Sequence, residues 1–296
     1  MPFLGELSAL ITALLWSVGS YAFTHAVENI GSVQLNMNRL MLAAVLLFLT
    51  IVIFNFNYDL SYNQLLNLSI SGIIGLVIGD LFLFKAYSQI GARLTILLMS
   101  FAPVLSALMA FFFLSERISF VGITGMVITV VGILLVVSER NKSPEAKYKM
   151  TPWGFFNGFM AAAGQAGGLI FAKLAFDRGE INGFVATFVR IFTSVIILLI
   201  VLVIVRQFKN PVKTYRHNGK ALLTTFIGTV CGPFLGVTFS LIAVEYTKVG
   251  IAATLISTMP VIMLPISKYY FKDKLSWRSI TGAFIAVVGI AILFLR

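Results

Sequence analysis

Residues 116–133 read ERISFVGITGMVITVVGI, and residues 273–290, which lie 157 positions later, read DKLSWRSITGAFIAVVGI. The two stretches share a pair of opposite charges, a serine, a Thr-Gly pair and a later glycine. Matches between apolar residues arise easily in a hydrophobic chain, so the shared glycines, serine and charges carry the comparison. The same shift aligns Pro103 with Pro260, and a shift near 151 aligns Arg39 with Arg190. We infer that the chain contains an internal duplication.

The composition of the chain is that of a polytopic membrane protein. Of its 296 residues, 59% are hydrophobic and 11% are charged, and the mean hydropathy is +0.97. Soluble domains carry about 25% charged residues, so this chain has too little polar surface to cover a water-soluble core. The single cysteine, Cys231, excludes a disulfide-stapled secreted domain.

Apolar runs of helical length recur along the whole chain, separated by short polar breaks. A spanning helix needs about 20 apolar residues, whereas the strands of a membrane barrel alternate apolar and polar residues, so we expect an all-α bundle. The predicted spans are ten in number. They cover residues 4–26, 33–54, 66–88, 94–114, 120–138, 153–176, 183–205, 221–244, 250–271 and 277–295.

A polar linker at residues 139–152 divides the predicted spans into a first repeat, 1–138, and a second repeat, 153–296. Each repeat has five spans, an odd number, so the second repeat must enter the membrane from the opposite side. Inverted repeats of this kind are typical of secondary transporters, in which the substrate site lies near the midplane between the halves.

With these features the chain resembles the drug/metabolite transporter superfamily, specifically its ten-helix EamA-type members. The resemblance rests on two matching sets of residues: Ala86, Gly91, Pro103, Glu116, Arg117, Gly125 and Gly132, and Ala243, Pro260, Asp273, Lys274, Gly282 and Gly289. It implies a transporter of a prokaryotic cell membrane (the inner membrane where there are two). Similar proteins export amino acids and related metabolites, often driven by an ion or proton gradient. The resemblance also implies that helices 1–4 and 6–9 surround a central cavity.

Charged residues inside spans are the first candidates for a functional site, because each costs a few kcal/mol to insert. Asp80 is the only acidic residue well inside a predicted span. Two interpretations stay open for it: a proton-coupling or substrate-binding carboxylate, or a structural ion pair with Lys85 or Arg39. The guanidinium groups of Arg39 and Arg190 would suit a carboxylate or phosphate, or would hold helices 2 and 7 to a neighbouring helix.

Polar and aromatic residues in other spans are candidates for the cavity wall, with packing or a hydrogen bond between helices as the alternative. They are Trp16, Tyr21, Ser100, Gln165 and Ser257. Gln165 lies in the run Gly164–Gly168, whose small residues let a ligand or another helix approach the backbone. Pro103 and Pro260 each lie within a predicted span, where proline removes a backbone hydrogen bond, so we expect helices 4 and 9 to bend there as hinges.

Sequence alone therefore predicts a secondary active transporter, an exporter of a small metabolite such as an amino acid. Its expected partners are the solute, the lipid bilayer and protons or another coupling ion, in a monomer or homodimer. The alternative is a membrane scaffold or channel without a transport cycle. We expect no enzymatic activity, cofactor or metal, because the chain has no catalytic motif and its two histidines are far apart.

The net charge of +11 is not read as a nucleic-acid footprint, because of where the basic residues lie. Of the 22 basic residues, 14 fall on one predicted side of the membrane. The positive-inside rule assigns that side to the cytoplasm and both termini to the outside, whereas the resemblance implies both termini inside.

Overall fold

The computed structural model describes residues 3–138, 151–216, 218–259, 261–262 and 277–294. Every regular element in these ranges is helical, as the apolar runs predicted. The first half contains α1 (Leu4–Ile30), α2 (Ser32–Phe54), α3 (Tyr62–Gly72), the π-helix η1 (Ile73–Gly79), α4 (Asp80–Met99), α5 (Ala102–Leu114) and α6 (Phe120–Ser138).

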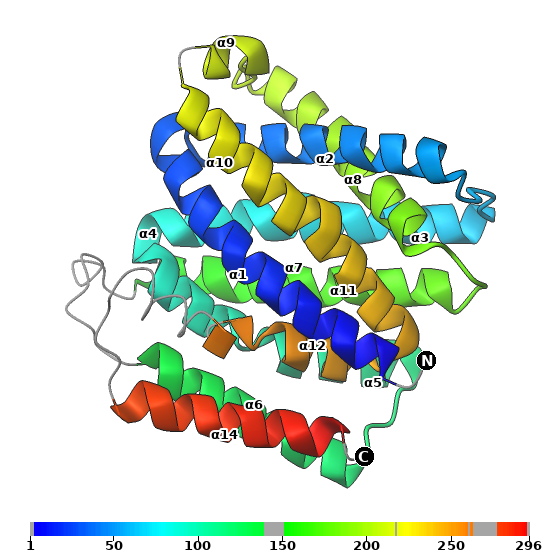
Figure 1. The fold of residues 1–296 in the computed structure, drawn as a ribbon, viewed down its shortest axis with the longest axis vertical. Helices are drawn as coiled ribbons and strands as arrows, with labels where there is room; N and C mark the ends of the chain where they lie inside the picture. The colour runs from blue at the N-terminus through cyan, green and yellow to red at the C-terminus, as the bar shows by residue number, and fades with distance from the viewer. Residues whose placement is uncertain (1–2, 139–150, 217, 260, 263–276, 295–296) are drawn as a thin grey trace.

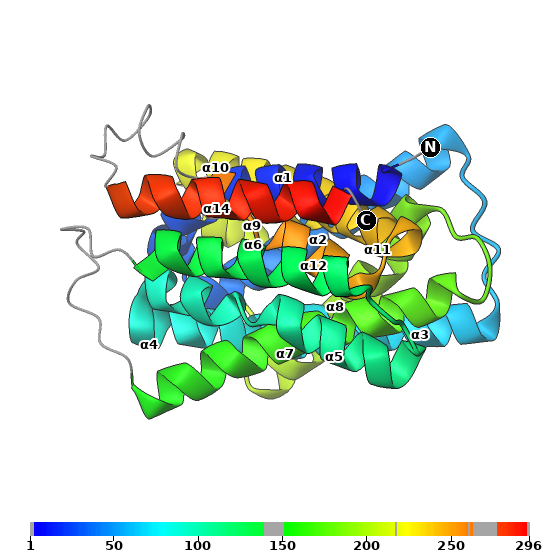
Figure 2. The ribbon, with the colours of Figure 1, turned by 90° about the horizontal axis from the view of Figure 1, so that it is seen from below.

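The second half repeats this order with one short addition. It contains α7 (Pro152–Phe176), α8 (Gly183–Ile204), the short α9 (Pro211–Tyr215), α10 (Gly219–Thr229), the π-helix η3 (Val230–Phe234), α11 (Leu235–Tyr246), α12 (Val249–Ile256) and α14 (Trp277–Phe294). The helices form one bundle in which the chain passes back and forth along a common direction (Figures 1 and 2).

Six helical segments of the described residues are long and apolar enough to cross a membrane. They are 32–54, 62–86, 152–176, 183–204, 219–246 and 277–294. Shorter apolar helices lie at Leu4–Ser20, Ala102–Leu114 and Phe120–Val136. Residues 260 and 263–271 of the ninth predicted span, 250–271, lie outside the described residues, and the count of ten stays a prediction.

The elements recur at the spacing that the sequence comparison revealed. Helices α3 and α10 have 11 residues each, and both their first and their last residues are 157 positions apart. Each is followed directly by a π-helix, η1 or η3. A π-helix is a wider turn within a helix, and it is rare in proteins. Its presence at matching positions therefore agrees with a duplicated unit.

The two halves exchange their helices instead of forming separate bundles. Helix α7 of the second half packs on α3, η1 and α4 of the first half, and α1 packs correspondingly on α10, η3 and α11. Helix α2 packs against α8, and α6 lies beside α14 at the edge of the bundle (Figure 1). The core is consequently built where the halves meet.

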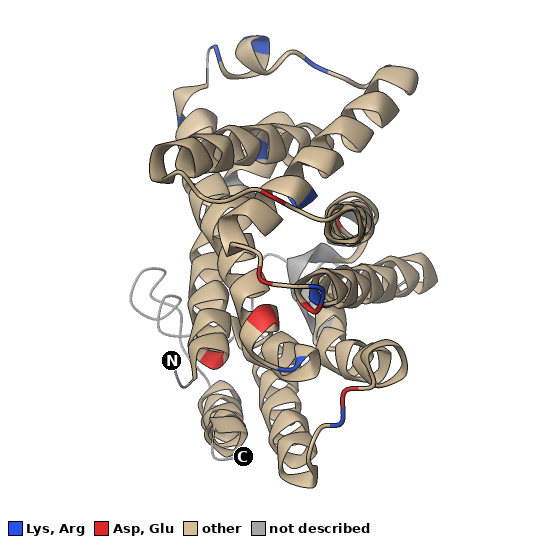
Figure 3. Ribbon diagram, turned by 90° about the vertical axis from the view of Figure 1, so that its right-hand side faces the viewer, with Lys and Arg blue, Asp and Glu red and all other residues tan. Residues whose placement is uncertain are grey.

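Both chain ends lie at the same end of the bundle (Figure 1), where the rings of Phe3 and Phe294 are 5.5 Å apart between centroids. Acidic segments are spread over this end in Figure 3, while the segment around α9 carries only basic ones. That segment, 206–220, contains five basic residues and no acidic residue. An even number of membrane crossings would give this placement of the ends.

Helix α4 departs from the predicted boundaries. We expected separate spans at 66–88 and 94–114, but α4 continues through residues 89–93 and ends at Met99. Residues 62–99 would measure roughly 57 Å as one straight helix, nearly twice the ~30 Å hydrocarbon core, so this stretch changes direction instead of crossing once. In Figure 1 the turn lies at α4, on the left edge of the bundle.

The break between α4 and α5 begins at Ser100, three residues before Pro103. Pro103 has no N–H for the carbonyl of Met99, four residues earlier, and its ring crowds that carbonyl. The helix accordingly ends at Met99 and restarts at Ala102 with proline in its first turn, a position where the missing N–H costs nothing.

The second half is interrupted in the same place. Helix α12 ends at Ile256, four residues before Pro260, and Ser257 and Thr258 form a turn. Pro260 itself lies outside the described residues. Ser257 and Thr258 are 157 positions after Ser100 and Phe101, the turn residues of the first half.

A seam of glycines joins α7 to η1. A Cβ atom on Gly164 would lie 2.7 Å from the Cα of Gly79, and one on Gly168 would lie 3.1 Å from the Cα of Gly75. The hydroxyl of Ser71 also donates a hydrogen bond to the carbonyl of Gly168. The small residues around Gln165 therefore admit another helix of the same chain.

We predict that Gly164→Ala destabilises the protein by about 1–3 kcal/mol, because the added methyl group must push two backbones apart. Gly219→Ala is the matched control, since a Cβ atom at Gly219 meets nothing within 4 Å. Thermal unfolding of the purified protein in detergent, followed by tryptophan fluorescence, measures both. Equal midpoints for the two variants would show that the seam tolerates a side chain.

Candidate functional site

Arg39 and Asp80 form a largely buried ion pair between α2 and α4. Arg39 lies in α2, and Asp80 is the first residue of α4, directly after η1. A guanidinium nitrogen of Arg39 contacts a carboxylate oxygen of Asp80, and the two side chains are 12% and 13% exposed. Asp80 thus has one of the two partners expected for a structural ion pair, Arg39.

Three further side chains hold the guanidinium of Arg39. Its Nε donates to the amide oxygen of Asn36, one turn earlier in α2, at 2.9 Å. The rings of Phe23 in α1 and Phe84 in α4 each lie with their centroid 5.2 Å from its central carbon. Aromatic faces attract a cation by their quadrupole, most strongly where water is excluded. Arg39 is consequently fixed between α1, α2 and α4.

The two phenylalanines escaped the sequence reasoning. The chain contains 27 phenylalanines, most of them in apolar runs, so nothing in the pattern distinguishes Phe23 and Phe84 from side chains that face lipid. Only the packing of α2 against both α1 and α4 makes them neighbours of Arg39.

Arg190 of α8 is the second buried arginine, with 4% of its surface exposed. It interacts electrostatically with Asp80, but the direct contact of Asp80 is with Arg39. The hydroxyl of Thr187, one turn earlier in α8, donates to the carbonyl of Gly183 in its own helix at 2.7 Å. Within the described part of the chain, Nε and Nη1 of Arg190 have no hydrogen-bond acceptor.

The guanidinium of Arg190 reaches the middle of the bundle. Its Nη2 lies 3.2 Å from where a Cβ atom on Gly75 would be, and Gly75 is near the centre of the 25-residue span 62–86. Arg190 and Gly75 come from different halves of the chain. The charged cluster of Arg39, Asp80 and Arg190, hereafter the central cluster, therefore lies where the halves meet.

The remaining candidates are placed as follows. Trp16 is half-buried against α11, where a Cβ atom on Gly236 would lie 2.4 Å from its ring. Gln165 is half-buried in α7, Ser100 is buried at the interruption before α5, and Ser257 is the half-buried residue that ends α12. Tyr21 lies in α1, and its side chain is outside the described atoms. Their roles as cavity residues stay predictions.

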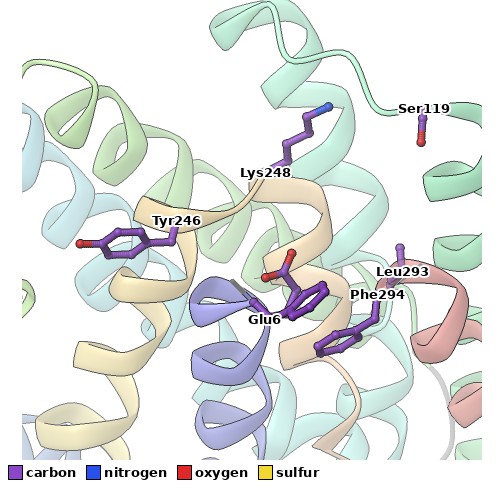
Figure 4. Close-up of a pocket in the computed structure, with 7 residues that line it drawn as sticks. Glu6, Ser119, Tyr246, Lys248, Leu293 and Phe294 are labelled. Carbon is purple, nitrogen blue, oxygen red and sulfur yellow. The ribbon is translucent and has the colours of Figure 1, made fainter. Parts of the chain in front are cut away.

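Two open cavities lie at the two ends of the bundle, away from the central cluster. One, of about 410 Å³, is lined by the α1–α2 turn and residues 206–209. The other, of about 480 Å³, is at the end with the termini. There the carboxylate of Glu6 lies between Lys248 and Phe294 (Figure 4), and it accepts a hydrogen bond from the hydroxyl of Thr247 at 3.2 Å.

Glu116 ties the two halves together near this end. It lies in the loop between α5 and α6, and its carboxylate accepts a hydrogen bond of 3.0 Å from the N–H of Val249, the first residue of α12. Burial raises the pKa of Glu116 above its ordinary value of 4.5, and the hydrogen bond from Val249 only partly offsets that effect. Lys248 in turn donates to the carbonyl of Arg117.

Comparison with known proteins places this architecture among transporters. The sequence pattern of the EamA-like transporter family matches residues 3–138 and 152–295. A protein of Archaeoglobus fulgidus, described as an uncharacterized transporter, is 21% identical over 292 residues, which are 98% of this chain and 97% of that protein. A solved crystal structure covers 100% of this chain and 98% of its own at 16% identity, with a TM-score of 0.77. That structure supports the fold alone.

We predict that Arg39→Gln and Asp80→Asn each destabilise the protein by about 3–5 kcal/mol, because each leaves a buried charge without its partner. The double variant should be less destabilised than the sum of the two, since it removes both charges. The pair Lys173–Asp177, with its atoms 3.8 Å apart and Asp177 half-exposed, is the control.

For that control pair we expect a coupling within about 1 kcal/mol. Thermal unfolding of all six variants gives both couplings. If the effects of Arg39→Gln and Asp80→Asn simply add, the ion pair contributes nothing beyond its separate side chains.

A second prediction concerns pH. Because the pKa of Glu116 is raised on folding, the folded protein holds this proton more tightly than the unfolded chain. Its contribution to stability is complete below the unfolded pKa and is lost as the pH rises through the folded pKa. Glu116→Gln should therefore gain stability relative to the parent protein as the pH rises above 4.5, the ordinary pKa of the carboxyl group. Unfolding midpoints across this rise in pH measure the effect, with Glu180→Gln in an exposed loop as control. Parallel curves for Glu116→Gln and the parent would contradict the assignment.

Proposed function

The chain belongs to the EamA-like transporter family, and from this premise we propose that it is a secondary active exporter of a small metabolite, such as an amino acid or a related solute. The chain is an integral, multi-pass membrane transporter with a small-molecule substrate and a lipid environment. The similarity to an archaeal protein supports a prokaryotic cell membrane as its location.

We place the transport cycle in two inverted five-helix repeats that alternate in access. The separate matches of the family pattern to 3–138 and 152–295 support this division. So do the matching lengths and positions of α3 and α10 and the two π-helices. In secondary transporters the substrate site lies near the midplane where such repeats meet. In this chain, that is the position of the central cluster.

The helix interruptions at Ser100–Phe101 and Ser257–Thr258 are the proposed hinges. Each leaves backbone groups outside the regular helical bonding pattern, and such irregular backbone is tolerated within a membrane where it is buried in protein or faces a cavity. Both interruptions lie beside residues proposed as lining, Ser100 and Ser257. A movement at matched hinges in the two halves would open the centre to one side and then to the other.

Asp80 is the proposed coupling residue. It is the carboxylate of the central cluster, and its partner Arg39 is held by α1, α2 and α4. Protonation would weaken its pairing with Arg39 and release α4 from α2. The carboxylate would thereby link proton binding to helix packing. The observation that carries the proposal is this ion pair at the junction of the two halves.

We predict that replacing Asp80 impairs only the movement of solute that is driven by a pH gradient. Purified protein in liposomes is first screened by solute counterflow with amino acids, organic acids and nucleosides. Asp80→Asn should abolish accumulation driven by a pH gradient while leaving counterflow measurable, because exchange does not require net proton movement. Asp59→Asn, in a loop, is the control.

Gradient-driven accumulation by Asp80→Asn equal to that of the parent protein would remove Asp80 from coupling. A protein that passes solutes down their gradients without counterflow would be a channel, and one that moves no solute would be a scaffold. Either result would replace the transporter cycle with the rival function.

A further inference from the structure

We propose that the buried guanidinium of Arg190 binds the negatively charged oxygen group of the transported solute, so that the protein carries small oxyanions or solutes with a carboxylate. The inference rests on the proposed transport function and deepens it by naming the substrate class. It uses three independent observations: the charge of the central cluster, its unpaired donors and its position.

The charges of the central cluster do not balance. Two guanidinium groups, on Arg39 and Arg190, share the single carboxylate of Asp80, and the direct contact is with Arg39. Arg39 is further stabilised by two aromatic rings. Among the described residues, Arg190 is therefore the member whose charge has no counterion in direct contact. A buried charge without a partner is unfavourable, and one bound monoanion would neutralise the excess.

The unsatisfied hydrogen-bonding groups are of the kind that an anion satisfies. Nε and Nη1 of Arg190 are buried N–H donors without an acceptor in the described part of the chain, and so is Nδ2 of Asn36, whose oxygen orients Arg39. Native proteins leave few buried donors unpaired. The centre is thus rich in donors and short of acceptors, and carboxylate or phosphate oxygens are pure acceptors for a guanidinium.

The guanidinium of Arg190 lies at the junction of the two halves. Its Nη2 lies beside Gly75 of η1, which has no side chain, and the carbonyl of Gly164 in α7 is 3.9 Å from the position of the absent Cβ. The guanidinium therefore lies among α8, η1 and α7, helices from both halves. A movement of one half against the other would change its surroundings, as a substrate site with alternating access requires.

Formate tests this chemistry because it is the smallest carboxylate, and formamide is its neutral counterpart of nearly equal size. The thermal unfolding of the purified full-length protein is followed with increasing sodium formate, sodium phosphate, formamide or sodium chloride at constant ionic strength. A ligand that binds only the folded state raises the midpoint with its concentration. We expect formate or phosphate to raise it in a saturable way, while formamide and chloride do not. If formate binds more tightly than phosphate, the solute carries a carboxylate; if phosphate binds more tightly, it carries a phosphate.

Arg190→Gln should weaken the formate or phosphate dependence by about tenfold or more, whereas Arg178→Gln, a loop arginine, should leave it unchanged. If Arg190→Gln does not fold, Gly75→Ala provides the second variant, because its methyl group would lie 3.2 Å from Nη2 and should reduce the affinity without changing the charge. Equal responses of the parent to formate and formamide, or of the parent and the folded variants to formate, would overturn the proposal.

The two proposals fail in different experiments. A protein that shows counterflow of neutral solutes but no stabilisation by oxyanions would refute the anion site and leave the transporter cycle standing. A protein that binds formate through Arg190 but shows no counterflow would refute the cycle and leave the anion site standing.

Discussion

The contact of bare backbone between α7 and η1 is the constraint on which the rest of the structure depends. Within a bilayer, helices gain little from hydrophobic burial against each other, so they associate through close packing and hydrogen bonds. Gly164 and Gly168 of α7 meet Gly79 and Gly75 of η1 closely: a Cβ atom on Gly164 would lie 2.7 Å from the Cα of Gly79, and one on Gly168 would lie 3.1 Å from the Cα of Gly75. This contact joins the second half of the chain to the first.

The position of the charges follows from that contact. Asp80 directly follows Gly79, so the seam carries its carboxylate into the interior, where Arg39 is held between two aromatic rings. Gly75 leaves room for the guanidinium of Arg190. The glycines that pack the helices together and the charged residues proposed for function thus belong to the same contact between helices. The packing brings two arginines and one carboxylate together at the junction of the halves.

Much of the fold could be read from the residues because its signals are local. Apolar runs predicted the helices, and prolines at matching positions predicted interruptions in both halves. The position of each interruption was wrong by three residues, since proline disturbs the carbonyl four residues before it and the helix ends there. The chain changes direction within α4, which continues as helix through residues 89–93, where a break between two spans was expected.

The sequence by itself determined the membrane class, the helical secondary structure, the internal repeat and the few charges within spans, because each depends on composition or on spacing along one helix. Tertiary structure decided which of these charges meet. Arg39 and Asp80 are 41 residues apart, and Phe23 and Phe84 are ordinary members of apolar runs. Only the packing of α1, α2 and α4 around Arg39 brings these four residues together, and α8 of the second half adds Arg190. Whether a buried charge has a partner depends on which helices lie side by side, and within the described residues that arrangement leaves Nε and Nη1 of Arg190 without a hydrogen-bond acceptor.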